Sequence, residues 1–178
     1  MIDALPWLVW IGLTVIAIAL SRYAWRARQT YGLFRFLAFE TLFALIALNI
    51  RHWFHEPLSL RQLISWVLLL GSIGLAGHGF YLLRVIGQAQ ENIIEGTQTI
   101  VQTGAYKYIR HPLYGALLLL GWGVFFKGLD WPSGILALLA TVFLWATARC
   151  EESYNRDRFG AAYTEYMRRT KMFIPFLL

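Results

Sequence analysis

Residues 62–83 read QLISWVLLLGSIGLAGHGFYLL, an apolar run without an acidic, lysine or arginine side chain. At about 1.5 Å of rise per residue, a helix of this length reaches about 33 Å, which is enough to cross the hydrocarbon core of a bilayer. Two other uncharged runs, residues 4–21 and 131–148, have roughly the minimum length that a membrane span needs. The sequence therefore predicts a protein that crosses the membrane several times.

Composition supports this class, because 58% hydrophobic and 15% charged residues are too apolar a mixture for an ordinary soluble domain of 178 residues. Two less regular runs, 36–50 with Glu40 inside it and the short run 112–126, still reach about 25 Å with their interfacial ends. We predict an all-α, polytopic membrane helix bundle that forms a single domain over residues 1–178. Its expected spans are about 4–22, 35–50, 62–86, 112–129 and 131–149.

The positive charges are distributed unevenly among the connections between these spans. Short loops rich in Lys and Arg stay in the cytoplasm. Only Arg51, Arg61 and Lys127 fall on one side, so the N-terminus is expected outside and the C-terminus in the cytoplasm. The net charge of +6 then suits anionic lipid headgroups better than a nucleic-acid partner. The other thirteen of the 16 Lys and Arg residues fall on the opposite side, and they are Arg22, Arg26, Arg28, Arg35, Arg84, Lys107, Arg110, Arg149, Arg156, Arg158, Arg168, Arg169 and Lys171.

Two longer segments, 87–111 and 150–178, are expected on the cytoplasmic side, which places a functional site there. The first is polar with Gly breakers and predicts a loop containing a short strand at 99–102. The second predicts one amphipathic surface helix over 151–169, with Tyr163 and Tyr166 on its apolar side. The single cysteine, Cys150, predicts neither a disulfide nor a thiolate metal site.

A basic cluster, Arg110-His111-Pro112-Leu113-Tyr114, precedes the fourth span. Pro112 suits the first turn of a helix, so the span is expected to begin beside His111. Unpaired N–H groups at a helix start, together with Arg110 and His111, favour an anionic carboxylate or phosphate. On residue types alone, an interfacial anchor made of Arg and Tyr is the stronger interpretation.

An acidic pair, Glu151-Glu152, follows the fifth span on a face where anionic headgroups repel carboxylates. The pair is expected either to neutralise nearby arginines at helical spacing or to accept hydrogen bonds from an ammonium or a ribose diol of a ligand. Taken alone, salt-bridge packing is the stronger interpretation. If the chain leaves the bilayer once between the two clusters, both return to the same membrane face.

Together the clusters resemble a known family. The stretch GAYKYIRHPLY at 104–114 resembles the G-x-Y-x-x-x-R-H-P-x-Y signature of the membrane methyltransferases typified by isoprenylcysteine carboxyl methyltransferase, with phospholipid methyltransferases as relatives. Further elements of the same pattern, in the same order, are Glu151-Glu152, Phe159-Gly160, Tyr163, Tyr166, Arg169 and Ile174-Pro175-Phe176. The resemblance covers about the C-terminal half of the chain.

The resemblance implies S-adenosylmethionine as methyl donor, bound from the cytosol. It assigns cofactor binding to Tyr106, Arg110, His111, Pro112, Leu113, Tyr114, Glu151 and Glu152. Arg110, Glu152 and Arg169 are the expected catalytic residues, with Arg169 orienting an acceptor carboxylate. An amine acceptor has to lose a proton, and Glu152 or His111 would then assist. The acceptor is expected to be lipophilic, either an isoprenylcysteine-like carboxylate or a lipid headgroup.

Two ionisable residues inside the spans, Glu40 and His78, require an explanation, because a charge in the hydrocarbon costs about 2.5 kcal/mol or more. They are expected to face the bundle interior and either to pair or to line a tunnel for the acceptor. A packed polar contact is the competing explanation. Two other functions stay open, a sterol-reductase-like membrane enzyme that uses NADPH and a non-catalytic membrane scaffold.

Overall fold

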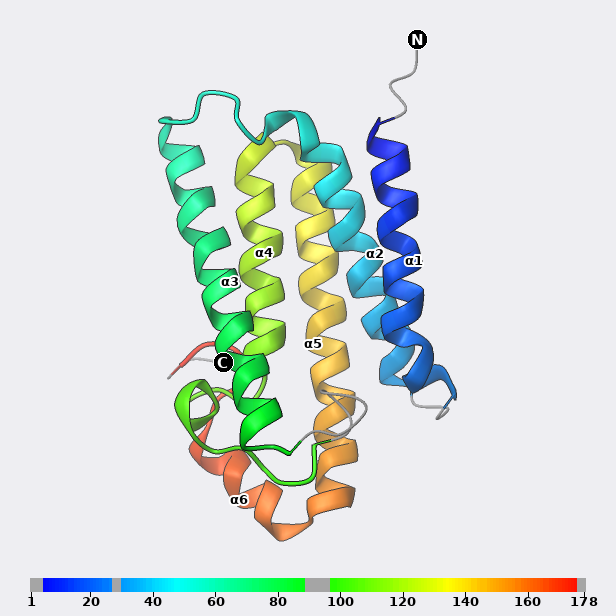
Figure 1. Ribbon diagram of the computed structural model, residues 1–178, viewed down its shortest axis with the longest axis vertical. Coiled ribbons are helices and arrows are strands. Elements are labelled where there is room, and N and C mark those ends of the chain that lie inside the picture. The colour runs from blue at the N-terminus through cyan, green and yellow to red at the C-terminus, as the bar shows by residue number, and fades with distance from the viewer. Residues whose placement is uncertain (1–4, 27–29, 89–96, 176–178) are drawn as a thin grey trace. The chain divides into compact units, whose positions relative to one another are not determined.

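The computed structural model describes residues 5–26, 30–88 and 97–175, and within these ranges it is all-α (Figure 1). No strand forms in the described part of the chain. The predicted all-α membrane bundle is therefore confirmed. The elements are α1 (Leu5–Arg26), α2 (Tyr31–Asn49), η1 (Ile50–His52), α3 (Leu60–Val85), η2 (Gly104–Lys107), α4 (Pro112–Gly128), α5 (Trp131–Phe159) and α6 (Ala161–Arg169).

Each of the five expected spans corresponds to one of the helices α1 to α5. Three segments are long and apolar enough to cross a bilayer, namely Tyr31–His52, Leu60–Val85 and Trp131–Phe159. Leu5–Ala19 and Pro112–Gly128 are shorter apolar helices. Many large apolar side chains on these helices point outward, as expected where lipid rather than water surrounds the protein.

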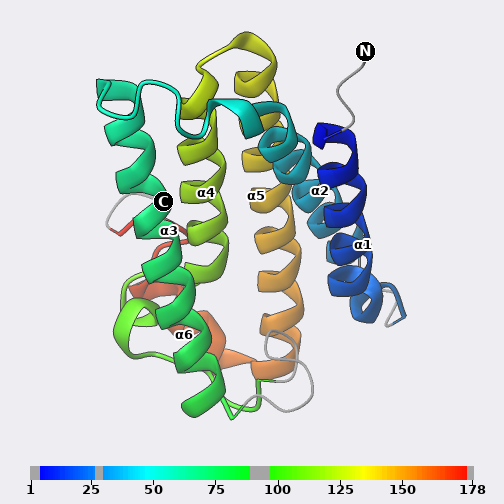
Figure 2. The same ribbon diagram turned by 45° about the horizontal axis from the view of Figure 1, so that its top comes forward.

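The chain forms two compact units, and α3, α4 and α5 contribute residues to both. The first unit comprises Met1–Leu69 and Leu118–Cys150, and the second comprises Leu70–Leu117 and Glu151–Leu178. In the first unit α1 runs beside α2 in both views (Figures 1 and 2). The core of this unit is a cluster of Leu45, Leu69, Val124 and Ala137.

A buried lysine organises the connection between α2 and α3 in the first unit. The Lys127 side chain is fully buried. Its Nζ lies 2.8 Å from Gln62 Oε1 and 3.5 Å from the centroid of the Trp66 ring. Gln62 Nε2 in turn donates to the carbonyls of His52 and His55. The ammonium and the amide together hold the connection against α4, an arrangement that the sequence did not predict.

The second unit contains the end of α3, η2, the start of α4, the end of α5, and α6. Its apolar core is formed by Leu82, Leu83, Val101 and Tyr106. Residues 97–103 form an irregular loop, so the predicted strand at 99–102 is wrong. The loop is held instead by hydrogen bonds to the residues just after α3, from Gln98 N to Gly87 O and from Thr99 Oγ1 to Ile86 O, and no strand among the described residues pairs with it.

The predicted helix over 151–169 is also corrected. Helix α5 continues without a break to Phe159, and Gly160 then adopts φ 59° and ψ −133° before α6 begins. L-residues rarely adopt this conformation, so the glycine ends one helix and starts the next. On α6 the side chains of Tyr163 and Tyr166 are buried while most of their neighbours are exposed, which confirms the amphipathic character predicted for the C-terminal helix.

Candidate functional site

Helix α4 begins at Pro112, as predicted, and the residues before it are held by the C-terminus. Residues 170–173, here called the C-terminal strap, run parallel to 108–111. Arg110 N donates to Lys171 O at 2.8 Å and His111 N donates to Met172 O at 3.1 Å. Lys171 N donates to Tyr108 O at 3.0 Å. The strap thereby satisfies backbone groups near the helix start that would otherwise lack partners.

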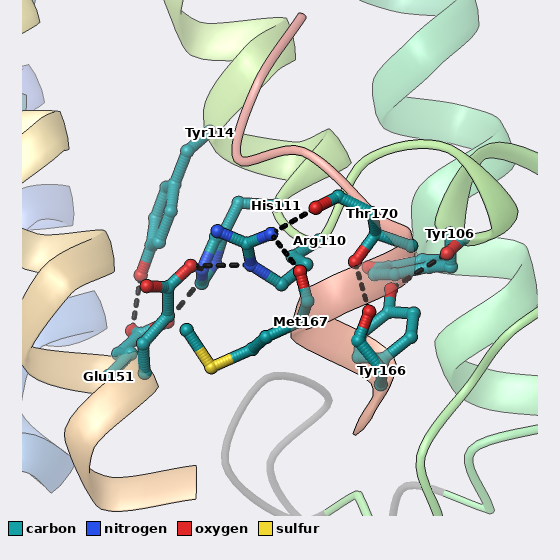
Figure 3. Close-up of polar contacts among 9 residues, drawn as sticks. Tyr106, Arg110, His111, Tyr114, Glu151, Tyr166, Met167 and Thr170 are labelled. Carbon is teal, nitrogen blue, oxygen red and sulfur yellow. Dashed lines mark hydrogen bonds and ion pairs between the residues drawn. The ribbon is translucent and has the colours of Figure 1, made fainter. Parts of the chain in front are cut away.

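The Arg110 guanidinium connects three segments of the second unit (Figure 3). Its Nε donates to Glu152 Oε1 at 2.6 Å, with only 9% and 3% of the two side chains exposed. Its Nη1 donates to the carbonyls of Met167 and Thr170. The planar fork of arginine suits this combination of carboxylate and carbonyl acceptors. Arg110 therefore fixes the end of α5, the end of α6 and the strap to the start of α4.

The His111 imidazole lies between the two carboxylates of the acidic pair. Its Nε2 is 3.4 Å from Glu152 Oε1, and its Nδ1 is 3.9 Å from Glu151 Oε2. The ring stacks on Tyr114, with centroids 5.6 Å apart, and contacts Phe173 of the strap. Nε2 is buried and forms no hydrogen bond with any described residue. A buried polar atom of this kind is available to a ligand.

Tyr114, in the first turn of α4, donates its hydroxyl hydrogen to Glu151 Oε1, and Figure 3 shows the two side chains pointing toward each other. Such a bond orients the carboxylate. The two members of the acidic pair therefore have different partners, because Glu152 contacts Arg110 and Glu151 contacts Tyr114. The cluster contains two carboxylates but only one guanidinium, so it carries an excess of negative charge whenever His111 is neutral.

Three buried tyrosines form the other side of the site. Tyr166 donates its hydroxyl hydrogen to the Tyr106 carbonyl at 2.7 Å, and Tyr163 packs edge-on against Tyr166. Burial raises the pKa of Tyr163 to about 12, and the pKa values of Tyr106 and Tyr166 are raised further, also chiefly by burial. All three therefore stay protonated at neutral pH. The sequence predicts Tyr163 and Tyr166 on the apolar side of the C-terminal helix and as elements of the family pattern, and their spacing of three residues places them on one helix face.

The remaining cofactor-binding candidates lie at the start of α4. Pro112 is fully buried. Leu113 packs closely on α3, because a Cβ added at Gly79 would come within 2.8 Å of Leu113 Cδ2. The structure therefore brings together every residue that was expected to bind the cofactor, either in the polar cluster or in the packing beside it.

The other candidate residues have separate environments. Arg169 is 63% exposed and pairs with Glu165 on α6 at 3.4 Å. Glu40, in the first unit, accepts a hydrogen bond from Thr14 Oγ1 at 3.1 Å. His78 Nε2, in the second unit, accepts one from Ala105 N at 3.3 Å. The expected roles of Arg169 toward the acceptor and of Glu40 and His78 in a tunnel stay predictions.

The charged and polar groups of the cluster suit a ligand that carries an ammonium, a carboxylate and a further positive charge. The carboxylates of Glu151 and Glu152 attract an ammonium, and the start of α4 attracts a carboxylate. His111 Nε2 adds a buried polar atom without a hydrogen-bond partner among the described residues. The residues present therefore fit a ligand that carries both an amino acid moiety and a further positive charge.

Comparison with known proteins agrees with this chemistry. Residues 60–162 match the model of a family described as phospholipid methyltransferase. The matched segment runs from the start of α3 into α6 and includes Tyr106, the basic cluster and the acidic pair. No curated protein matches the chain. The family resemblance drawn from the sequence is confirmed.

Proposed function

The chain belongs to the phospholipid methyltransferase family, and from that premise we propose that it transfers a methyl group from S-adenosylmethionine to a lipophilic acceptor. The observation that carries the proposal is the contact of Arg110 with Glu152 at 2.6 Å, with His111 between the two carboxylates. This contact joins the two halves of the family pattern in one buried cluster.

The proposed cofactor site is formed by Tyr106, Arg110, His111, Pro112, Leu113, Tyr114, Glu151 and Glu152. When bound, the cofactor would supply an activated methyl group on a sulfonium, with the neutral thioether S-adenosylhomocysteine as the leaving group. The residues of the site then mainly bind, orient and exclude water, and alignment of this kind is worth up to roughly 7 to 11 kcal/mol in favourable cases.

The side chains divide this work between them. Glu151, oriented by Tyr114, attracts positive charge. Glu152, already held by Arg110, contacts Nε2 of His111, on the side of the imidazole away from Glu151. Arg110 acts through the segments that it joins, because its Nε and Nη1 are engaged within the protein. With an amine acceptor, His111 Nε2 or Glu152 takes the proton that the amine loses.

The acceptor side is proposed to involve Arg169 and Glu40. Arg169, exposed at the end of α6, is available to orient an acceptor carboxylate. Glu40 lies on α2 and is proposed to contact the lipophilic acceptor. Residues 1–178 form one catalytic domain in this proposal, with the N-terminus outside and both the cofactor site and the C-terminus in the cytoplasm.

The test is calorimetry on the detergent-purified protein with S-adenosylhomocysteine, the demethylated product. Binding is expected for the unchanged protein and is expected to be lost in Glu151→Gln/Glu152→Gln. Glu165→Gln is the matched control, because Glu165 is half exposed on α6 and outside the cluster. Binding of NADPH instead of S-adenosylhomocysteine would contradict the proposal.

A second experiment identifies the acceptor. The protein is incubated with S-adenosylmethionine labelled in the methyl group and with a membrane lipid extract, and the labelled product is identified by mass spectrometry. The expected result is label in a lipid or lipid-modified molecule. Label that stays in the donor under all conditions, despite binding of S-adenosylhomocysteine, would show that the site binds the cofactor without transfer to lipid.

A further inference from the structure

His78 on α3 contacts the backbone of the segment that presents Tyr106. Its Nε2 accepts a hydrogen bond from the N–H of Ala105 at 3.3 Å. Ala105 is the second residue of η2, the short helix Gly104–Lys107 that contains Tyr106. On the basis of the proposed function, we infer that His78 is a positioning residue of the cofactor site. It acts by holding η2 and not by contacting the methyl acceptor.

Gly104 provides a second, independent sign that η2 is docked onto His78. A Cβ at Gly104 would lie 2.4 Å from His78 Nε2 and 2.7 Å from Leu82 Cδ1. Gly104 also has φ +56°, a backbone conformation that favours glycine. The backbone conformation favours glycine here, and a Cβ would in addition displace either the loop or the tips of His78 and Leu82.

The bond to His78 complements two other contacts that hold Tyr106. The Tyr106 carbonyl accepts the hydroxyl hydrogen of Tyr166 at 2.7 Å, and its ring is buried against Leu82 and Val101. Tyr166 therefore holds η2 from α6, whereas His78 holds it from α3. Without the hydrogen-bond acceptor atom Nε2 of His78, the peptide before Tyr106 loses this contact with α3.

This role makes a kinetic prediction that differs from that of a tunnel residue. A residue that positions η2 affects the affinity for the methyl donor, because η2 leads directly into the basic cluster at Arg110 and His111. A residue that lines an acceptor tunnel affects the KM of the acceptor instead. The two roles are therefore separated by measuring both KM values in the same variant.

The experiment compares His78→Leu, which removes the acceptor atom, with His78→Gln, which keeps one at a similar reach. Gly74→Ala on α3 is the matched control, because a Cβ there meets nothing within 4 Å. His78→Leu is expected to weaken S-adenosylhomocysteine binding by roughly 3- to 10-fold, the range that corresponds to one hydrogen bond. The KM of the donor rises by the same factor and the KM of the acceptor does not change. His78→Gln recovers most of the affinity, and Gly74→Ala matches the unchanged protein.

Hydrogen exchange on the ligand-free protein tests the same contact without any activity. Exchange of the Ala105 amide is expected to be faster in His78→Leu and unchanged in Gly74→Ala. If the unchanged protein binds no S-adenosylhomocysteine, the proposed function fails while the exchange result still decides whether His78 holds η2. Unchanged exchange in His78→Leu, or a rise in the KM of the acceptor alone, overturns the inference.

Gly104→Ala provides a second variant if His78→Leu does not fold. It keeps the imidazole but separates it from the loop by moving one or the other, so the same loss of donor affinity and the same faster exchange at Ala105 are expected. Donor affinity equal to that of Gly74→Ala would overturn the inference.

Discussion

Arg110 Nε and Glu152 Oε1 meet at 2.6 Å, although the two residues are 42 positions apart in the chain. Both side chains are almost completely buried. Removing one member of a buried ion pair leaves an uncompensated charge, which typically costs about 3 to 5 kcal/mol. The contact is therefore as important for stability as for the proposed chemistry.

The first prediction concerns this pair. Arg110→Met and Glu152→Met are each expected to lower the free energy of unfolding by about 3 kcal/mol or more, whereas the double variant loses less than the sum, because no lone charge remains. Thermal unfolding of the purified protein measures all three. Arg168→Met, at a side chain that is 76% exposed, is the control and is expected to stay within about 0.5 kcal/mol. Strict additivity of the two single effects would contradict a direct coupling.

The second prediction concerns the orientation of Glu151. Tyr114→Phe removes the hydroxyl that donates to Glu151 and leaves the ring stacked on His111. Binding of S-adenosylhomocysteine is expected to weaken by about tenfold, which corresponds to about 1.4 kcal/mol. Calorimetry measures the change, and Tyr81→Phe on α3, where Tyr81 is 61% exposed, serves as the control. Equal affinities in the two variants would remove Tyr114 from the proposed site.

The third prediction concerns Lys127 in the first unit. Lys127→Met fills a similar space but leaves Gln62 Oε1 without its buried donor and removes the cation from the Trp66 ring. We expect a loss of about 2 kcal/mol in the free energy of unfolding, because an unpaired buried acceptor costs about 1 to 3 kcal/mol. Thermal unfolding is compared with Lys107→Met, at an exposed lysine of η2. A loss of the same size in both variants would mean that the buried ammonium has no special role.

The fourth prediction concerns alkaline pH. The pKa of Tyr163 is about 12 in the folded protein and 10.0 in an unperturbed tyrosine, chiefly because burial disfavours the charged form. The stabilisation of the neutral phenol is therefore complete below pH 10 and is lost as the pH rises from about 10 to 12. Since one pKa unit corresponds to about 1.4 kcal/mol, the effect is on the order of 3 kcal/mol.

Thermal unfolding as a function of pH tests whether stability is lost in this direction. The midpoint of the unchanged protein is expected to fall steeply above pH 10, and Tyr163→Phe is expected to reduce the slope, because one buried ionisable phenol is absent. A slope that is the same in both proteins would assign the alkaline effect to Tyr106 and Tyr166 alone.

Features that depend on a short stretch of chain could be predicted from the sequence. The helical spans follow from the length of apolar runs, since a bilayer accepts few other structures. The start of α4 follows from Pro112, which has no N–H and fits the first turn. The pairing of a basic with an acidic cluster was expected from the family pattern, and the direct contact of Arg110 with Glu152 agrees with it.

Features that depend on distant partners could not be predicted in this way. The break at Gly160 was missed because a single glycine among charged helix-forming residues is tolerated in many helices, and only its positive φ reveals the turn. The C-terminal strap was missed because its pairing with 108–111 joins backbone groups about sixty residues apart, for which side-chain types carry no signal.

The sequence by itself determined that this is a membrane-embedded helical protein with a methyltransferase-like pattern, because hydrophobic length and a contiguous motif are local properties. Only the tertiary structure decided what each polar side chain does. It gives Arg110 two backbone carbonyls in addition to Glu152, and it gives His78 the amide of Ala105. Hydrogen-bond partners depend on the position and direction of atoms to within a few tenths of an ångström, and those are set by packing of segments that lie far apart in the chain.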